Sequence, residues 1–261
     1  ATLAGAGMEY TFHVTLIEIY NDTIRDLLST NPRAALKTTH EVRQLGTHGV
    51  PVVTGLESVK VETTADVARV MRRGHEIRAT AATNLNEHSS RSHLVMTIFI
   101  EGRSTRGDGV ELHSKLNLVD LAGSERVSKS GSSGDRLREA QHINKSLSML
   151  GTCIAALVAR TRARKRRGGD GAAKMHIPYR DCRLTHVLAD SLGGDSKTLM
   201  FIHLAPCSSH VPESLCSLAF GCRVKNVNLK ALKHVGLGAV AGGAGRGAPQ
   251  CEQGSPRRRR G

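Results

Sequence analysis

Segments of strand character alternate with segments of helical character through most of this chain. Four apolar or β-branched stretches are short enough to be strands, and they cover residues 12–20, 94–101, 112–119 and 198–205. We predict helices over residues 64–80, 137–159, 183–192 and 213–227. The clearest is 137–159, where apolar residues recur every three or four positions. This alternation predicts an α/β domain, in which helices cover the faces of a sheet.

The composition is compatible with a folded core. The chain has 261 residues, of which 39% are hydrophobic, but aromatic residues make up only 3%, so aliphatic side chains must do most of the packing. The six cysteines form no Cys-x-x-Cys pair and no signal peptide precedes them, which favours reduced thiols in a cytosolic protein. No apolar run approaches the roughly 20 residues that cross a bilayer, so we expect no membrane contact.

Positive charge is concentrated in two short segments. The formal net charge is +14, but residues 160–167 hold six bases and residues 257–260 hold four, so the rest of the chain is only mildly basic. From about residue 235 the sequence is too rich in Gly and too poor in large apolar residues to fold. We therefore predict a folded domain over 1–230 with a basic insertion at 160–175, and a disordered Gly- and Arg-rich tail over 231–261.

A candidate phosphate sensor follows the strand predicted at 112–119. The stretch KLNLVDLAGSER, residues 115–126, places Asp120 just past a strand that we expect to be buried. This is the edge where open α/β sheets bind ligands, and Asp120 can hold Mg²⁺ there through a water. Gly123 has no Cβ, so its N–H can approach a phosphate oxygen closely. Alone, an Asp-x-x-Gly pattern is more often a simple turn.

A second polar motif lies between a predicted helix and the strand at 94–101. The stretch NEHSSRSH, residues 86–93, holds three hydroxyls, one Arg and two His. By itself this cluster is better explained by a solvated loop or a helix cap. Taken together with the Asp-x-x-Gly motif, it supplies what a phosphate switch needs.

The expected roles in this switch follow from the side chains. Ser89 and Ser90 can offer hydroxyls to Mg²⁺ and to the γ-phosphate or the attacking water. Arg91 can pair with Glu125 and so close the two loops over the phosphate. We therefore predict that the catalytic residues are Ser89, Ser90, Arg91, Gly123 and Glu125. The predicted metal-binding residues are Ser90 and Asp120, the latter through a water.

The order Asn-x-x-Ser-Ser-Arg-Ser-His and then Asp-Leu-Ala-Gly-Ser-Glu resembles the two switch loops of the kinesin motor domain. The similarity also includes residues 14–28, 139–157, 177–206 and 213–227, so it covers most of the chain in order. It implies a P-loop NTPase-like fold with a central, mostly parallel or mixed sheet and helices on both faces. It also implies a microtubule-stimulated ATPase with ATP and Mg²⁺ as cofactors. The implied cofactor-binding residues are Asn86, Ser89, Ser90, Asp120 and Gly123.

The phosphate-binding loop of the family is not found in these residues. Kinesin motors carry Gly-x-x-x-x-Gly-Lys-[Ser/Thr] shortly before the region that 14–28 resembles, yet this chain has no Gly-Lys dipeptide. The stretch GGDSKT, residues 193–198, is better explained as a turn. We therefore expect that the chain starts after the loop and lacks the first strands of the sheet. On this interpretation the intact protein is an ATPase motor, and these residues alone are inactive.

Microtubules are the partner that the resemblance implies. In kinesins the helix matching 137–159, the loop before it and the segment after it form the microtubule-binding face. Basic residues there would be attracted to acidic tubulin, although without the family match an ordinary solvated face explains them better. The candidate contacts are Arg126, Lys129, Arg136, Lys145, Arg162, Arg164, Lys165, Arg166, Arg167, Arg180 and Arg183.

The base-rich residues 160–174 interrupt the family pattern. Six like charges repel one another and the second half is Gly-rich, so we expect a mobile segment that does not fold alone and that attracts the acidic tails of tubulin. A solvated loop or a nuclear-import signal is together an equally good explanation.

The subfamily and two alternatives complete the predictions. The stretches GDRLREAQHINKSL and CRVKNVNL look most like kinesins with a C-terminal motor that moves toward the minus end. Such a protein is expected in the cytoplasm on microtubules, including the spindle, and dimerises through a coiled coil upstream. The alternatives are a nucleotide-independent microtubule- or RNA-binding basic protein, or a truncated gene product. Aromatic interleaving and recognisable RNA or DNA modules are missing, so specific nucleic-acid recognition is not expected.

Overall fold

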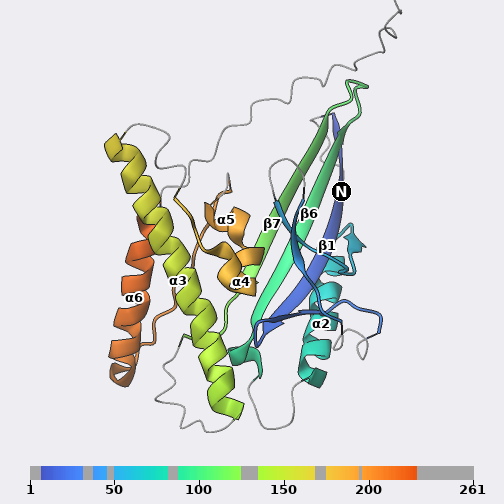
Figure 1. Ribbon diagram of the computed structural model, residues 1–261. Helices are drawn as coiled ribbons and strands as arrows, with labels where there is room; N and C mark the ends of the chain where they lie inside the picture. Colours follow the sequence, from blue (N-terminus) through green and yellow to red (C-terminus); the bar gives the residue numbers. More distant parts are fainter. Residues whose placement is uncertain are drawn as a thin grey trace, which may run out of the picture.

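A sheet with helices on both faces makes up the described part of the chain (Figure 1). The computed structural model describes residues 7–31, 38–45, 50–81, 88–124, 135–167, 175–193 and 196–227. Its strands are β1 (Met8–Tyr20), β2 (Thr23–Asp26), β3 (Val42–Leu45), β4 (Val50–Val53), β5 (Val59–Val61), β6 (His93–Ser104) and β7 (Glu111–Asp120). Its helices are α2 (Thr64–Ala81), α3 (Asp135–Arg167), α4 (Arg183–Val187), α5 (Ala189–Gly193) and α6 (Val211–Lys225). Short 3₁₀ turns are η1 (His88–Arg91), η4 (Tyr179–Asp181) and η5 (Ser208–His210).

Three long strands, β1, β6 and β7, form the centre of the sheet. The strand order is β2-β1-β6-β7, β5 also pairs with β1, and β3 and β4 form a separate hairpin. Every pairing among the described strands is antiparallel, so the parallel part of the expected sheet is not found in the residues that the structure describes. Short connections are the reason, because they return the chain beside the strand that it has just left. Asn21 and Asp22 make the β1–β2 turn with positive φ angles of 51° and 55°.

The apolar run in β1 is continuous because both of its faces are covered. Val14 and Leu16 belong to a core that includes Val70 of α2, whereas Ile17 and Ile19 belong to a second core that includes Leu184 of α4. Successive residues of a strand point to opposite faces, so these two sets separate naturally. Figure 1 shows the same arrangement, with α2 on one side of the sheet and α3, α4, α5 and α6 on the other.

Most of the predicted elements are confirmed. The strands predicted at 12–20, 94–101 and 112–119 correspond to β1, β6 and β7, and the helices predicted at 64–80, 137–159 and 213–227 correspond to α2, α3 and α6. The helix predicted at 183–192 is divided at Leu188 into α4 and α5.

Two predictions about strands are wrong. Residues 196–206 form neither strand nor helix, although 198–205 has a strand-like sequence. A strand persists only where its N–H and C=O groups are paired, and no described strand pairs with this segment. The burial predicted for the strand before Asp120 is also wrong, because most residues of β7 are exposed. Nothing among the described strands covers its outer edge.

The prediction that the basic segment does not fold is wrong for its first half. Residues 160–167 continue α3 as helix up to Arg167, whereas 168–174 lie outside the described residues. Adding residues to an existing helix avoids the cost of nucleation, and Ala, Arg and Lys are good helix formers, which outweighs the charge repulsion. The proposed tail at 231–261 also lies outside the described residues, so the domain division stays a prediction.

None of the helices in the described ranges is long and apolar enough to cross a membrane.

Candidate nucleotide-switch site and partner-binding face

The two polar motifs meet at one edge of the sheet. The backbone N–H of Gly123 donates a hydrogen bond of 2.8 Å to the backbone C=O of Ser90. Ser90 lies in η1, immediately before β6, and Gly123 follows the end of β7. The register of the two strands places Asp120 opposite Leu94, at the same edge. The sequence predicted that these motifs act together, and this hydrogen bond joins them directly.

The side chains of the predicted switch are described only in part. Ser90 and Arg91 are half-buried, Gly123 is partly buried, and Asp120 is exposed at the end of β7. The side chain of Ser89 is not described, and Asn86 and Glu125 lie outside the described residues. The Arg91–Glu125 ion pair therefore stays a prediction.

The residues at this edge offer the donors that Mg²⁺ prefers. Magnesium binds hard oxygen ligands and usually keeps several waters together with the phosphates of its nucleotide. The Ser90 hydroxyl and the Asp120 carboxylate are both oxygen donors, and the exposure of Asp120 leaves room for a water between it and an ion. The set of donors fits the ion that the sequence predicted.

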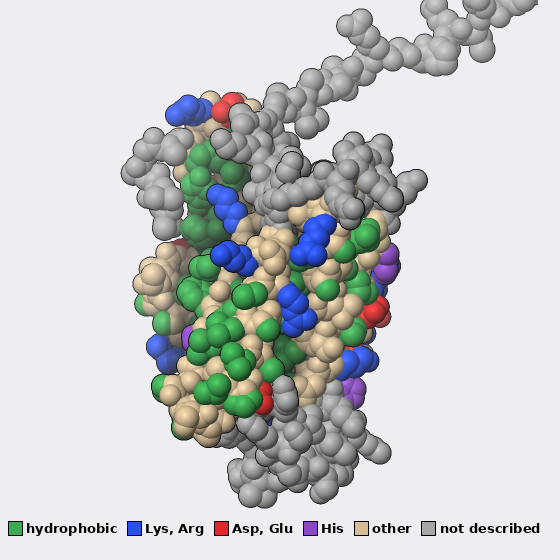
Figure 2. All heavy atoms as spheres, turned by 90° about the vertical axis from the view of Figure 1, so that its left-hand side faces the viewer, with side chains coloured by type: hydrophobic (Ala, Val, Ile, Leu, Met, Phe, Trp, Pro, Cys, Tyr) green, Lys and Arg blue, Asp and Glu red, His purple; other side chains and the backbone are tan. Residues whose placement is uncertain are grey.

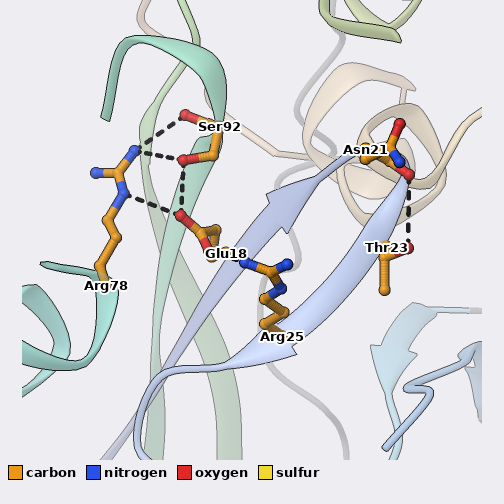
Figure 3. Close-up of polar contacts among 6 residues, drawn as sticks. All are labelled: Glu18, Asn21, Thr23, Arg25, Arg78 and Ser92. Carbon is orange, nitrogen blue, oxygen red and sulfur yellow. Dashed lines mark hydrogen bonds and ion pairs between the residues drawn. The ribbon is translucent and has the colours of Figure 1, made fainter. Parts of the chain in front are cut away.

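Ser92 connects the first motif to a buried ion pair that sequence analysis missed. Arg78 donates from Nε to Glu18 Oε1 at 3.1 Å and from Nη2 to the hydroxyl and the carbonyl of Ser92 at 2.8 and 3.1 Å. The Ser92 hydroxyl donates to Glu18 Oε1 at 2.7 Å (Figure 3). Glu18, Arg78 and Ser92 are all buried. A charged residue inside the apolar run of β1 is the one signal that could have revealed this network.

The network fixes the position of the segment just after Arg91. The three residues come from β1, from α2 and from the start of β6, so the contacts join both neighbours of the motif. Arg25 adds a second ion pair to Glu18 at 3.4 Å, and its guanidinium lies 4.8 Å from the centre of the Tyr20 ring. A charge that is buried, paired and fully hydrogen-bonded allows little movement, so this side of the motif is rigid.

His93 connects the same segment to the second motif and to α3. The backbone N–H of Ala122 donates to its Nδ1 at 3.0 Å, and its Nε2 lies 2.7 Å from Ser146 Oγ. Burial lowers the pKa of His93 to about 4, Asp120 opposes this shift, and Arg78 adds to it. The ring is therefore neutral near pH 7.

The predicted microtubule contacts are placed on the helical side of the sheet. Lys145 and Arg162 are exposed on α3, and the exposed Arg180 donates to Gln44 Oε1 at 2.9 Å. Arg183 is half-buried, and its backbone N–H donates to Asp22 Oδ1 at 2.8 Å. In Figure 2, which looks onto α3 and α6, Lys and Arg side chains lie among apolar ones and outnumber Asp and Glu.

The other predicted contacts cannot be placed as side chains. The backbones of Arg136 and of residues 164–167 belong to α3, but their side chains are not described. Arg126 and Lys129 lie outside the described residues. The position of Lys145 and Arg162 on one continuous helix still shows that α3 carries basic residues over most of its length.

The fold and the joined motifs describe a nucleotide-switch domain, and comparison with known proteins identifies the family. A family model named "Kinesin motor domain" matches residues 3–227. Kinesin-like protein KIN-14R of Oryza sativa subsp. japonica is 43% identical over 238 residues, which are 89% of this chain and 22% of that protein. Kinesin-like protein KAR3 of Saccharomyces cerevisiae is 42% identical over 231 residues, which are 87% of this chain and 30% of that protein.

Solved structures agree with this assignment. The motor domain of Saccharomyces cerevisiae Kar3 has a TM-score of 0.66 and 42% identity, over 84% of this chain and 61% of that one. A KIF14 dimer, two-heads-bound with AMP-PNP and in complex with a microtubule, has a TM-score of 0.71 and 36% identity, over 85% of this chain and 60% of that one. The chain belongs to the kinesin motor domain family, whose members are ATPases, and it is similar to the KIN-14 and Kar3 kinesins. It spans 22% and 30% of the two curated relatives above.

Proposed function

We propose that this chain is the switch and microtubule-binding part of a minus-end-directed kinesin motor. In the complete protein, ATP hydrolysis would be coupled to movement on microtubules in the cytoplasm. The phosphate-binding loop is not among these 261 residues, so ATP turnover belongs to a protein in which this chain is joined to such a loop. Dimerisation through a coiled coil and a role in the spindle are further parts of this proposal.

The hydrogen bond between Gly123 N–H and Ser90 C=O supports the proposal most directly. A loop that senses a terminal phosphate must be able to move, and this bond makes the two motif loops move together. Ser89, Ser90 and Gly123 would contact the γ-phosphate, and Arg91 with Glu125 would close the loops around it. Ser90 and Asp120 would hold Mg²⁺, which supplies charge neutralisation at the phosphates.

The position of α3 supports the proposed partner. This helix runs from Asp135 to Arg167, and it begins soon after the second motif. It presents Lys145 and Arg162 to solvent, and Arg180 lies exposed in the segment that follows. Basic groups on one face would accelerate encounter with acidic tubulin and help to set the register of binding.

The test uses the complete protein that contains this chain. Microtubules should raise the kcat of its Mg-ATPase, and Glu125→Ala should retain ATP binding but lose this stimulation, because Arg91 then has no carboxylate to close on. Glu76→Ala is the matched control, since Glu76 is an exposed acid on α2, on the other side of the sheet. The measurements are steady-state ATPase with and without microtubules, and nucleotide affinity.

Two results would contradict the proposal in different ways. Unchanged stimulation in Glu125→Ala would exclude the proposed Arg91–Glu125 pair. An absence of any microtubule-stimulated ATPase in the complete wild-type protein would exclude the motor function. Binding to microtubules that persists without nucleotide would then favour the alternative of a basic microtubule-binding protein.

A further inference from the structure

The ring of His93 bridges two parts of the molecule that have different roles in the proposed motor. On one side it accepts the N–H of Ala122, the neighbour of Gly123, at 3.0 Å. On the other side it contacts the hydroxyl of Ser146, a residue of α3, at 2.7 Å. One imidazole therefore lies between the loop proposed to sense phosphate and the helix proposed to contact microtubules.

The direction of every hydrogen bond in this bridge is determined. A backbone N–H can only donate, so Nδ1 of His93 must be the acceptor and the single proton of the neutral ring is on Nε2. That N–H donates to Ser146 Oγ, and the Ser146 hydroxyl donates in turn to the carbonyl of Ile143 at 2.7 Å. The chain of bonds thus runs from the backbone after β7 to the backbone of α3.

Burial makes the bridge stiff. His93, Ala122 and Ser146 are 3%, 5% and 8% exposed, so water has little access to replace any of these bonds. A buried donor or acceptor that loses its partner is costly, so the three elements must move together or break the bridge. The ring also stays neutral near pH 7, which keeps one tautomer in place.

We propose that His93 is a positioning residue that couples the loop after β7 to α3, so that a displacement of Gly123 is transmitted to the helix through Ala122, the imidazole and Ser146. The proposal rests on the proposed motor function and assigns to that function a transmission element. An ordinary buried histidine would only add stability, and the two roles differ in what they change kinetically.

The test compares variants that break the bridge on one side only, in the complete protein. His93→Asn keeps an acceptor near the position of Nδ1 but is too short to reach Ser146. Ser146→Ala leaves His93 and its bond to Ala122 intact but removes the partner on α3. Thr161→Ala is the matched control, because Thr161 is a half-buried α3 residue whose hydroxyl bonds only within the helix, to the carbonyl of Leu157 at 2.9 Å.

The expected result is a specific loss of coupling. In His93→Asn and in Ser146→Ala, the basal kcat and the KM for ATP should stay within about twofold of wild type. The stimulation by microtubules should fall at least about fivefold, the lower end of typical coupling between two sites. The double variant should lose no more than the single ones, because both break the same link. Thr161→Ala should behave as wild type.

Three results would overturn the proposal while leaving the motor function intact. They are wild-type stimulation in both single variants, an equal loss in basal and stimulated turnover, and losses that multiply in the double variant. Circular dichroism melts of each variant at the assay temperature verify that unfolding does not cause the loss. If wild-type protein itself shows no stimulation, the proposed function fails first.

Discussion

The Glu18–Arg78 ion pair is a residue-level device whose removal should be far more damaging than its net contribution suggests. Glu18 is completely buried and Arg78 is 5% exposed, so deleting one partner leaves an uncompensated charge in the interior. We predict that Arg78→Met lowers the free energy of unfolding by about 3–5 kcal/mol. The double variant Glu18→Gln/Arg78→Met should recover part of this loss, because both charges are then gone.

Urea unfolding of the complete protein measures these effects. Arg43→Ala is the control, since Arg43 forms an exposed ion pair with Glu41 at 3.3 Å and its removal should cost less than about 1 kcal/mol. A loss in Arg78→Met no larger than in the control would show that the network is not a buried anchor for Ser92.

The lowered pKa of His93 predicts a pH dependence of stability. The pKa is about 4 in the folded protein, against 6.5 for an unperturbed histidine. The unfolded chain therefore binds a proton between these values that the folded protein refuses, so stability falls as the pH decreases through this window. The contribution is fully present above pH 6.5, and about 2 kcal/mol of it is lost between pH 7 and pH 5.

The comparison with His93→Asn isolates this titration from that of other groups. Asp120 and Arg78 are the charged groups that act on the ring, and both are present in the variant. Urea unfolding at pH 7 and pH 5 should show a larger loss in wild type than in His93→Asn. Equal losses in the two proteins would mean that His93 titrates normally.

Among the elements, those with long periodic patterns could be predicted and those that depend on distant partners could not. The helix at 137–159 shows its apolar face in the sequence, and Leu150, Ile154 and Leu157 are indeed buried. The strands β2 to β5, with three or four residues each, are too short to show a period. Residues 198–205 have the composition of a strand but no described pairing partner.

The same distinction holds for the candidate site. The pairing of Ser90 with Gly123 was predictable because both belong to recognisable motifs. The bonds of Arg78 to Glu18 and of His93 to Ser146 join residues 60 and 53 positions apart, and no local pattern specifies such contacts. Sequence reasoning therefore found the residues proposed to contact phosphate, but missed the buried polar groups that position them.

The basic end of α3 gives a prediction about this element. Because residues 160–167 are helical, their charges are held on a rigid extension rather than on a free loop. We predict that changing all six bases to Gln weakens microtubule binding of the complete protein at low salt and changes kcat little. The effect should fade as salt shortens the Debye length from about 10 Å at 0.1 M to about 3 Å at 1 M.

Co-sedimentation with microtubules across a salt series measures this effect. Arg69→Gln/Arg72→Gln is the control for charge removal, because both residues are exposed on α2, on the opposite side of the sheet. Removing the acidic tubulin tails with protease should weaken wild type more than the six-base variant. An equal effect on both proteins would show that the basic end does not contact the tails.

The distribution of apolar surface over the molecule leads to the last prediction. Leu112, Leu116 and Leu118 of β7 are 41%, 47% and 48% exposed. Leu118 and Leu116 lie opposite Met96 and Ile98 of β6, which pack into the core on the α2 side. They therefore point to that side, beyond the area that α2 covers. Leu199 and Phe201 are more exposed still, at 76% and 75%.

Contiguous apolar surface of this kind, beside an unpaired strand edge, favours self-association. We predict that the 261-residue chain binds ANS and forms larger species as its concentration rises in sedimentation velocity. Leu116→Thr/Leu118→Thr should reduce both, because Thr keeps β propensity but removes apolar area. Val50→Thr, on the separate β3–β4 hairpin, is the matched control, since Val50 is also 37% exposed. A wild-type chain that stays monomeric and binds no ANS would show that these side chains are covered in solution.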